Sequence, residues 1–353
     1  MTFNDYPIIG WDIGGVNIKA VRLECQEGKI KAFRTAVRSF EIWREPGNLV
    51  MVLRDIAEEL GMQDLQSVAV TMTAELSDVF RTKQEGVRYV LDAIKKAFSK
   101  TPIYLFNLEG GFFRLDQARK NPLQCAATNW LASALFIAVD HPDCILMDIG
   151  STTTDIIPIR GGKVVSRGRN DPQRLTSGEL VYTGVLRTNP NTIVNQVPVA
   201  GRPCRVAAEY FTSMADIYLI LGQITPDQYT CTTADGRAKT IPAARDRLAR
   251  LVCSDSAIMS AEEVDTLARY LWEKQIQQII DSLLQVLSGL QNGFDLSLVV
   301  VGTGGGLAQE TARRLGMPII DVIQEWGSKA IACFPALAVA FLLAQEPVGE
   351  LDD

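Results

Sequence analysis

The sequence predicts an α/β protein built from two copies of one fold, and three observations support this prediction. An apolar strand ending in Asp-Ile-Gly occurs twice, at Asp12-Ile13-Gly14 and at Asp148-Ile149-Gly150. The chain of 353 residues exceeds what one hydrophobic core usually holds, so two domains are expected. The pattern of strands and helices also restarts near Cys144. We therefore expect a duplicated fold whose halves bind one phosphate-bearing ligand.

The first half begins with hairpins and continues with strand–helix units, which indicates a mixed sheet with helices on both sides. Its expected strands cover residues 8–12, 18–24, 30–40, 67–71 and 103–106, and its expected helices cover 48–60 and 87–98. Residues 123–139 read as a long apolar helix whose alanines allow close packing.

The second half repeats this order and then departs from it. Strands are expected at 144–148, 153–159, 163–167 and 298–301, and helices at 207–221, 243–252, 261–290 and 334–343. Residues 170–256 have no counterpart in the first half, so we interpret them as an insertion. We expect a first domain of residues 1–130 joined by the C-terminal helix 333–345, and a second of 131–332.

Composition limits the classes of function. The chain is 47% hydrophobic and 22% charged, as in ordinary globular proteins. A net charge of −6 argues against nucleic acid or a membrane surface as a partner. The longest apolar run, 131–139, is far shorter than the roughly 20 residues of a membrane span, and no signal peptide is recognisable. We expect a cytoplasmic protein.

Cysteine and histidine limit the chemistry further. The seven cysteines form no CxxC pair, and His141, which precedes Pro142, is the only histidine. Zinc sites, histidine-based triads and HExxH metalloproteases are therefore not expected, and the thiols should be reduced and mostly buried. The site should consist of carboxylates, hydroxyls, lysines and arginines, with Mg²⁺ as the cofactor.

The first Asp-Gly loop is a candidate phosphate and metal site. A carboxylate at a strand end, beside N–H groups freed by glycine, suits Mg²⁺ and phosphate together. The alternative is a plain tight hairpin in which glycine supplies a positive φ and Lys19 faces solvent. The candidate phosphate-binding residues are Asp12, Gly14, Gly15, Asn17 and Lys19.

The second Asp-Gly loop adds hydroxyl groups between Asp148 and Asp155. Hydroxyls and backbone donors at such a turn suit a Mg²⁺–diphosphate, although threonine may only continue a strand. The candidate phosphate-binding residues here are Gly150, Ser151, Thr152 and Thr153.

A third glycine loop follows the strand that ends at Val301. Backbone N–H groups and the dipole of the following helix favour an anion or a nucleotide at Gly302, Gly304 and Gly305. The spacing is not the dinucleotide-binding fingerprint, and a glycine turn without a ligand is the alternative.

Three loops in this order, with small-residue helices before the second loop and at the C-terminus, resemble the superfamily of acetate and sugar kinases, heat-shock chaperone ATPases and actin. The resemblance covers the whole scaffold apart from the insertion. It implies duplicated ribonuclease-H-like domains, the actin-like ATPase fold, facing a central cleft. It also implies that the Asp-Gly loops hold phosphates and that the late glycine loop borders an adenosine pocket.

Finer segments narrow the resemblance to the hydantoinase/oxoprolinase-related branch, and within it to the tetrahydromethanopterin-linked one-carbon pathway family. They are residues 70–78, 177–187, 208–211, 235–237 and 246–250. The resemblance implies a transferase that joins an aminomethylfuran methyl diphosphate to the phenol of γ-glutamyltyramine, or of a tyrosine-based analogue, with release of diphosphate. Hydantoinases proper are much longer, so hydantoin hydrolysis is not expected.

Under this hypothesis, roles follow from residue type and position. Asp12 or Asp148 holds Mg²⁺, Glu75 is the general base for the phenol, and Asp155 is the reserve base. Thr73, Lys83, Arg187 and Arg237 are the candidate substrate-binding residues. The alternatives are a helix cap for Glu75, a solvated helix face for Lys83, an amphipathic helix over 177–187 and surface charge at Arg237.

Two other functions stay open at this point. An ATP-dependent small-molecule kinase of the same fold would use Asp148 as the base and the third loop for adenosine. A nucleotide-binding switch without catalysis is the second alternative. The expected partners are a small-molecule diphosphate and a phenolic acceptor, and a homodimer is the oligomer considered.

Overall fold

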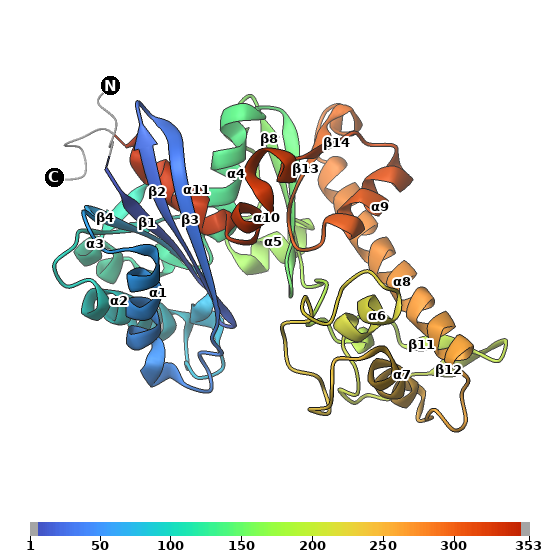
Figure 1. Cartoon of the computed structure of the whole chain (residues 1–353). Coiled ribbons are helices and arrows are strands. Elements are labelled where there is room, and N and C mark those ends of the chain that lie inside the picture. Colours follow the sequence, from blue (N-terminus) through green and yellow to red (C-terminus); the bar gives the residue numbers. More distant parts are fainter. Residues whose placement is uncertain (1–5, 347–353) are drawn as a thin grey trace. The chain divides into compact units, whose positions relative to one another are not determined.

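The computed structural model describes residues 6–346, and the chain forms two compact units (Figure 1). Unit 1 extends to Cys144 and includes Ile159–Val165 and the chain from Val322 onward. Unit 2 comprises Ile145–Pro158 and Ser166–Asp321. The predicted boundary at residue 130 falls inside unit 1, because the helix after it packs against the C-terminal helix.

Unit 1 contains a mixed six-stranded sheet in the order β3-β2-β1-β4-β5-β6. Its strands are β1 (Ile8–Ile13), β2 (Asn17–Gln26), β3 (Lys29–Ser39), β4 (Ser67–Met72), β5 (Ile103–Phe106) and β6 (Phe112–Arg114). β1, β2 and β3 form an antiparallel meander, whereas β4 runs parallel to β1. The register places Asp12 opposite both Lys19 and Thr71.

Helices cover both faces of this sheet (Figure 1). They are α1 (Leu49–Leu60), α2 (Lys83–Ala97), α3 (Leu115–Lys120), α4 (Asn129–Asp140) and α11 (Phe334–Gln345), and α10 (Ile323–Ala332) contacts α11. α11 lies against β1, β2 and β4, and Gly10 permits this approach because a Cβ there would collide with the carbonyl oxygen of Ala336.

The long helix expected over 123–139 was wrong in its first part. Pro122–Cys125 forms a separate 3-10 turn, and Ala127 takes a φ of 49°. A left-handed residue interrupts the α-helical path, so α4 starts at Asn129.

The second sheet repeats the order of the first, as β10-β8-β7-β13-β14 with β9 also paired to β8. Its strands are β7 (Cys144–Ile149), β8 (Thr154–Arg160), β9 (Lys163–Val164), β10 (Leu180–Val181), β13 (Ser297–Gly302) and β14 (Ile319–Asp321). β8, β7, β13 and β14 correspond to β2, β1, β4 and β5. The duplication predicted from the two Asp-Ile-Gly segments is confirmed.

The insertion of unit 2 is a small helical layer with one short hairpin. The remaining α-helices and strands of unit 2 are α5 (Asp171–Ser177), β11 (Gln196–Val199), β12 (Arg202–Arg205), α6 (Met214–Ile220), α7 (Ile241–Ala249), α8 (Ala261–Leu287) and α9 (Gly305–Leu315). α6 is much shorter than predicted, because a capping box of Ser213 and Asp216 begins it. α8 contacts α6, α7 and β11 of the insertion and also α9 of the scaffold (Figure 1).

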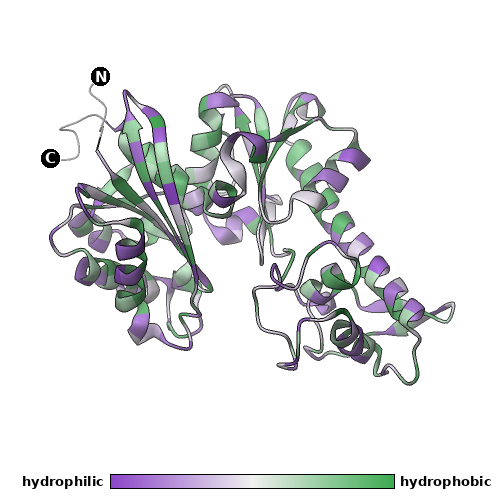
Figure 2. Ribbon diagram, in the orientation of Figure 1, coloured by the Kyte–Doolittle hydropathy of each residue, from purple (hydrophilic) through white to green (hydrophobic). Residues whose placement is uncertain are grey.

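Each unit has its own apolar core. Figure 2 shows hydrophobic residues along the strands of both sheets, while hydrophilic and hydrophobic residues alternate along outer helices such as α8. Trp11 is fully buried in unit 1, and Leu271 and Ile276 of α8 are fully buried in unit 2.

Between residues 6 and 346, no single helix is long and apolar enough to cross a membrane. α10 and α11 meet the length and composition criteria only together, as a pair bent by 105°, and α11 is largely buried in unit 1.

Candidate functional site

The first Asp-Gly loop brings a carboxylate and a lysine together at the end of β1. The amide of Gly14 donates to the carbonyl of Asn17 at 3.0 Å, which closes the turn and returns the chain into β2. Lys19 then lies opposite Asp12, with its Nζ 3.5 Å from Asp12 Oδ2. Asp12 is 5% exposed, and among the described residues its Oδ1 has no hydrogen-bond donor.

Burial raises the pKa of Asp12 above its ordinary value, and the neighbouring Lys19 offsets part of that rise. A buried carboxylate oxygen without a donor is costly unless a ligand or cation supplies the missing interaction. The first loop therefore has the character of a binding site.

The chain after β4 forms one wall of this loop. The amide of Thr73 donates to the carbonyl of Ile13 at 2.9 Å, and a Cβ on Gly14 would lie 3.5 Å from Thr73 Oγ1. A Cβ on Gly15 would lie 2.8 Å from Ser77 Oγ. Thr73 is thus adjacent to the first loop, and its role in substrate binding stays a prediction.

Glu75 and Lys83 follow Thr73 along the chain after β4. Glu75 is 2% exposed within the 3-10 turn Ala74–Leu76, and Gly86 of α2 packs directly on its backbone. Lys83 is the first residue of α2 and is half-buried. The N-cap of α2 is Thr82, whose hydroxyl accepts from the amide of Glu85 at 3.1 Å.

The second Asp-Gly loop has the same turn but different neighbours. The amide of Gly150 donates to the carbonyl of Thr153 at 2.8 Å. The third loop lies directly on it, since the amide of Gly304 donates to the carbonyl of Ile149 at 2.9 Å. Side chains are excluded from the contact, because a Cβ on Gly302 would collide with Asp148 Oδ1 and one on Gly304 with Ile149. Gly305, in contrast, has open space.

A segment of the insertion also covers the second loop, and we call residues 183–188 the strap. The amide of Val185 donates to the carbonyl of Gly150 at 3.1 Å. The amide of Arg187 donates to the carbonyl of Ser151 at 2.8 Å. Arg187, a predicted substrate-binding residue, is therefore placed next to the second loop.

Gly184 is a residue whose importance the sequence analysis missed. A Cβ on it would lie 2.6 Å from both the carbonyl oxygen of Gly150 and the amide of Thr152, so glycine is required for this close approach. The alternative of an amphipathic helix over 177–187 was wrong, because only the short strand β10 is regular there. The glycine at position 184, within the segment 177–187, was the signal that the sequence offered.

Asp155 has a partner that the sequence analysis did not anticipate. Its Oδ1 lies 2.7 Å from the Nη2 of Arg174 on α5, and both side chains are almost fully buried. Burial raises the pKa of Asp155, and Arg174 offsets part of the rise. As reserve base, Asp155 would have to work from within this ion pair.

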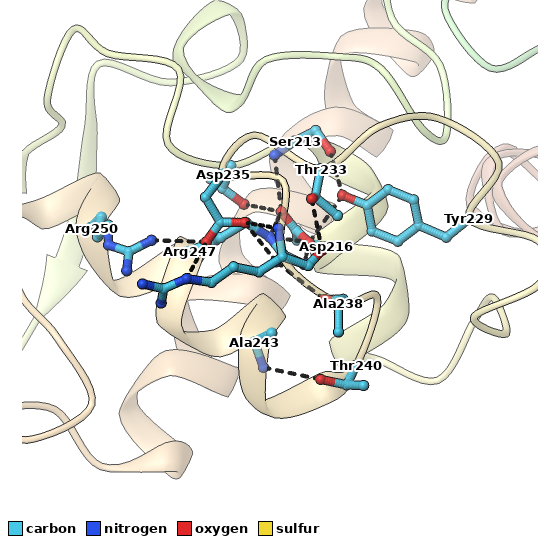
Figure 3. Close-up of polar contacts among 12 residues, drawn as sticks. Ser213, Asp216, Tyr229, Thr233, Asp235, Ala238, Thr240, Ala243, Arg247 and Arg250 are labelled. Atoms are coloured by element: carbon cyan, nitrogen blue, oxygen red, sulfur yellow. Dashed lines mark hydrogen bonds and ion pairs between the residues drawn. The ribbon is translucent and has the colours of Figure 1, made fainter.

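Arg237 lies on the surface of the insertion. Its side chain is 63% exposed, with Nε 3.8 Å from Asp235 Oδ2. The buried arginine nearby is Arg247, whose guanidinium lies between Asp216, at 2.6 Å, and Asp235, at 3.2 Å (Figure 3). This network holds α6, α7 and the loop between them together.

Each Asp-Gly loop contributes a single carboxylate, and among the described residues neither forms a metal cage made of protein side chains alone. Within residues 6–346, no three His, Cys, Asp or Glu side chains gather as a metal cluster. Mg²⁺ commonly uses one or two carboxylates together with waters and substrate phosphates. Asp12, with its buried Oδ1, and Asp148, beside Gly302, each offer one carboxylate in a loop of backbone donors.

Comparisons with known proteins agree with this architecture. Residues 66–346 match the family model for hydantoinase/oxoprolinase. A relative from Methanocaldococcus jannaschii, the (4-{4-[2-(gamma-L-glutamylamino)ethyl]phenoxymethyl}furan-2-yl)methanamine synthase, is 34% identical over 341 residues, which is 96% of this chain and 98% of the relative. A protein of the same name from Methanococcus vannielii is 33% identical over 216 residues, covering 60% of this chain and 95% of that protein.

Among solved structures, a nucleotide-free acetone carboxylase superposes with a TM-score of 0.63 at 12% identity, covering 95% of this chain and 70% of that one. At this identity the likeness shows the fold alone. The predicted fold class, duplicated ribonuclease-H-like domains of the actin-like ATPase type, is confirmed.

Proposed function

The chain belongs to the hydantoinase/oxoprolinase family, and we propose that it is a transferase of methanofuran-type cofactor biosynthesis. The observation that carries the proposal is the near full-length similarity to a synthase whose named product contains a furan and a phenol joined by an ether. In the reaction, the bond between the furfuryl carbon and diphosphate breaks, and a bond to the phenolic oxygen forms. Diphosphate and the phenolic proton are released.

In this reaction, the Asp-Gly loops would stabilise the diphosphate leaving group. An electron-rich furan stabilises a developing carbocation, so the main task is to neutralise the departing diphosphate. Backbone N–H groups of the two Asp-Gly loops and the ammonium of Lys19 are the candidate donors. Mg²⁺ held by Asp12 or Asp148 would supply further neutralising charge when bound.

Glu75 is the proposed base for the phenol. A phenol has a pKa of about 10, so an oxygen nucleophile at neutral pH gains from a nearby proton acceptor. Glu75 is 2% exposed and lies two residues after Thr73, whose amide donates to Ile13 of the first loop. Glu75→Gln should then slow ether formation more than it weakens diphosphate binding, because it removes a proton acceptor and no anion donor.

The deciding experiment supplies the synthetic furan diphosphate with γ-glutamyltyramine or with a tyrosine-based acceptor, with Mg²⁺ and with or without ATP. We expect ether product by mass spectrometry, one diphosphate per ether, no ATP requirement, and competition by inorganic diphosphate. ADP formed in step with added acceptor would instead make the protein a kinase with Asp148 as base. Nucleotide binding without turnover or ether formation would indicate a switch.

A further inference from the structure

Gln275 is a polar side chain in the apolar core between α8 and the insertion. It is fully buried, and its three hydrogen bonds are all made within the protein. Its Nε2 donates to Thr183 Oγ1 and to the carbonyl of Gly184, both at 2.9 Å. Its Oε1 accepts from the hydroxyl of Tyr218 at 2.9 Å.

The strap that Gln275 contacts determines how the second loop presents its backbone. The carbonyls of Gly150 and Ser151 both accept hydrogen bonds from strap amides. In a trans peptide unit, the carbonyl and the following N–H point in opposite directions. The N–H groups of Ser151 and Thr152 therefore point away from the strap, as two successive donors of the kind that bind anions.

The strap is fixed to the insertion as well as to the loop. The amides of Met214 and Ala215 at the start of α6 donate to the carbonyls of Thr188 and Leu186 at 2.9 and 3.1 Å. At the other end, Thr154 Oγ1 donates to the carbonyl of Thr183 at 2.8 Å. Gln275 adds a link from α8, the helix that contacts both insertion and scaffold.

We infer that Gln275 is a positioning residue for the second loop. Its amide holds Thr183 and Gly184 in the register that turns the Ser151 and Thr152 donors toward a diphosphate. An aliphatic residue would fill the same space without the desolvation cost of an amide, so the amide is expected to serve orientation. The choice of diphosphate as the ligand rests on the proposed function.

The test compares Gln275→Leu with Tyr218→Phe as a matched control. Both variants break buried hydrogen bonds of one network, but only Gln275→Leu removes the hydrogen bonds from α8 to the strap. By hydrogen exchange, peptides covering 149–154 and 183–188 should exchange at least about tenfold faster in Gln275→Leu and within about threefold of wild type in Tyr218→Phe. The first loop, 12–17, is an internal control that should not change in either variant.

Isothermal titration with inorganic diphosphate and Mg²⁺ gives the second readout. Gln275→Leu should raise the Kd about tenfold, and Tyr218→Phe should leave it within about twofold, with both variants melting at similar temperatures. Equal effects of the two variants, or faster exchange spread evenly over unit 2, would overturn the inference in favour of a merely structural role.

A milder variant covers the case in which Gln275→Leu does not fold. Thr183→Val keeps the shape but removes one acceptor of the amide, and it should speed exchange in the same two peptides by about threefold. No local change there would also overturn the inference. Absence of diphosphate binding by the wild type would count against the proposed function, while the exchange result would still decide the role of Gln275.

Discussion

The two Asp-Gly loops share one hairpin turn, yet the charged side chains beside them have different partners. Lys19 and Asp155 occupy the same place after their aspartates. In the first loop, Lys19 lies 3.5 Å from Asp12, so the hairpin carries its own cation. In the second, Asp155 pairs with Arg174, a residue outside the hairpin. The turn is thus the same in both halves, while the ion pair lies within the hairpin in the first and reaches outside it in the second.

The two loops also differ in the segments of chain that border them. The first loop is bordered by the chain immediately after β4, at Thr73 and Ser77. The second is covered by the third glycine loop and by the strap of the insertion. Both loops are thus bordered by the chain that follows the neighbouring strand, β4 for the first and β13 for the second, and the strap adds a further contact at the second loop.

The largest expected effect is a loss of stability when Arg174, the ion-pair partner of Asp155, is replaced. Arg174→Met leaves a buried carboxylate without its cation and should lower the free energy of unfolding by about 3–5 kcal/mol. Lys19→Met should cost less than half as much, because Lys19 is 30% exposed and its pair is weaker. Urea unfolding measures both, and Arg174→Met combined with Asp155→Asn should regain most of the loss. Equal losses at Lys19 and Arg174 would remove the contrast between the loops.

Adjacent glycines test how closely the third loop packs on the second. Gly304→Ala should cost about 1–3 kcal/mol, because its methyl group meets Ile149. Gly305→Ala, with open space around it, should change stability by no more than about 1 kcal/mol and can be stabilising within α9. Thermal unfolding of the two variants side by side is the measurement, and similar melting temperatures would contradict the packing described here.

Carboxylate replacement tests whether the second loop holds the metal. Asp148→Asn keeps the shape but removes a hard anionic ligand, so turnover should fall by at least about tenfold to a hundredfold. Steady-state assays over a Mg²⁺ series check this, with Asp12→Asn as the comparison. Unchanged activity with the same Mg²⁺ dependence would make Asp148 structural.

The smallest expected effect is a pH dependence at the first loop. Burial raises the folded-state pKa of Asp12 above 3.8, so the native state binds this proton more tightly than the unfolded state. Stability should therefore fall as the pH rises from 3.8 through the folded pKa, and the loss is complete above it. Asp12→Asn lacks this titration, so its stability relative to wild type should increase with pH in urea unfolding series. A difference independent of pH would contradict burial as the dominant influence.

Local sequence was enough to predict the turns and the fold class. Asp-Ile-Gly at a strand end and the glycine run after Val301 identify their loops, because turn formation depends on adjacent residues. The strands β1, β7 and β13 were found within a few residues for the same reason. The repeated order of these strands also predicted the duplication, which the sheet topology confirms.

The tertiary structure alone decided the environment of each loop. No periodicity links Gln275 to Gly184, or Arg174 to Asp155, since these partners meet only after distant segments pack together. Two helices also start later than expected, α4 after the left-handed Ala127 and α6 at the capping box of Ser213. Charge partners and buried hydrogen bonds are chosen by three-dimensional proximity, so the sequence could name the two loops but not what surrounds each of them.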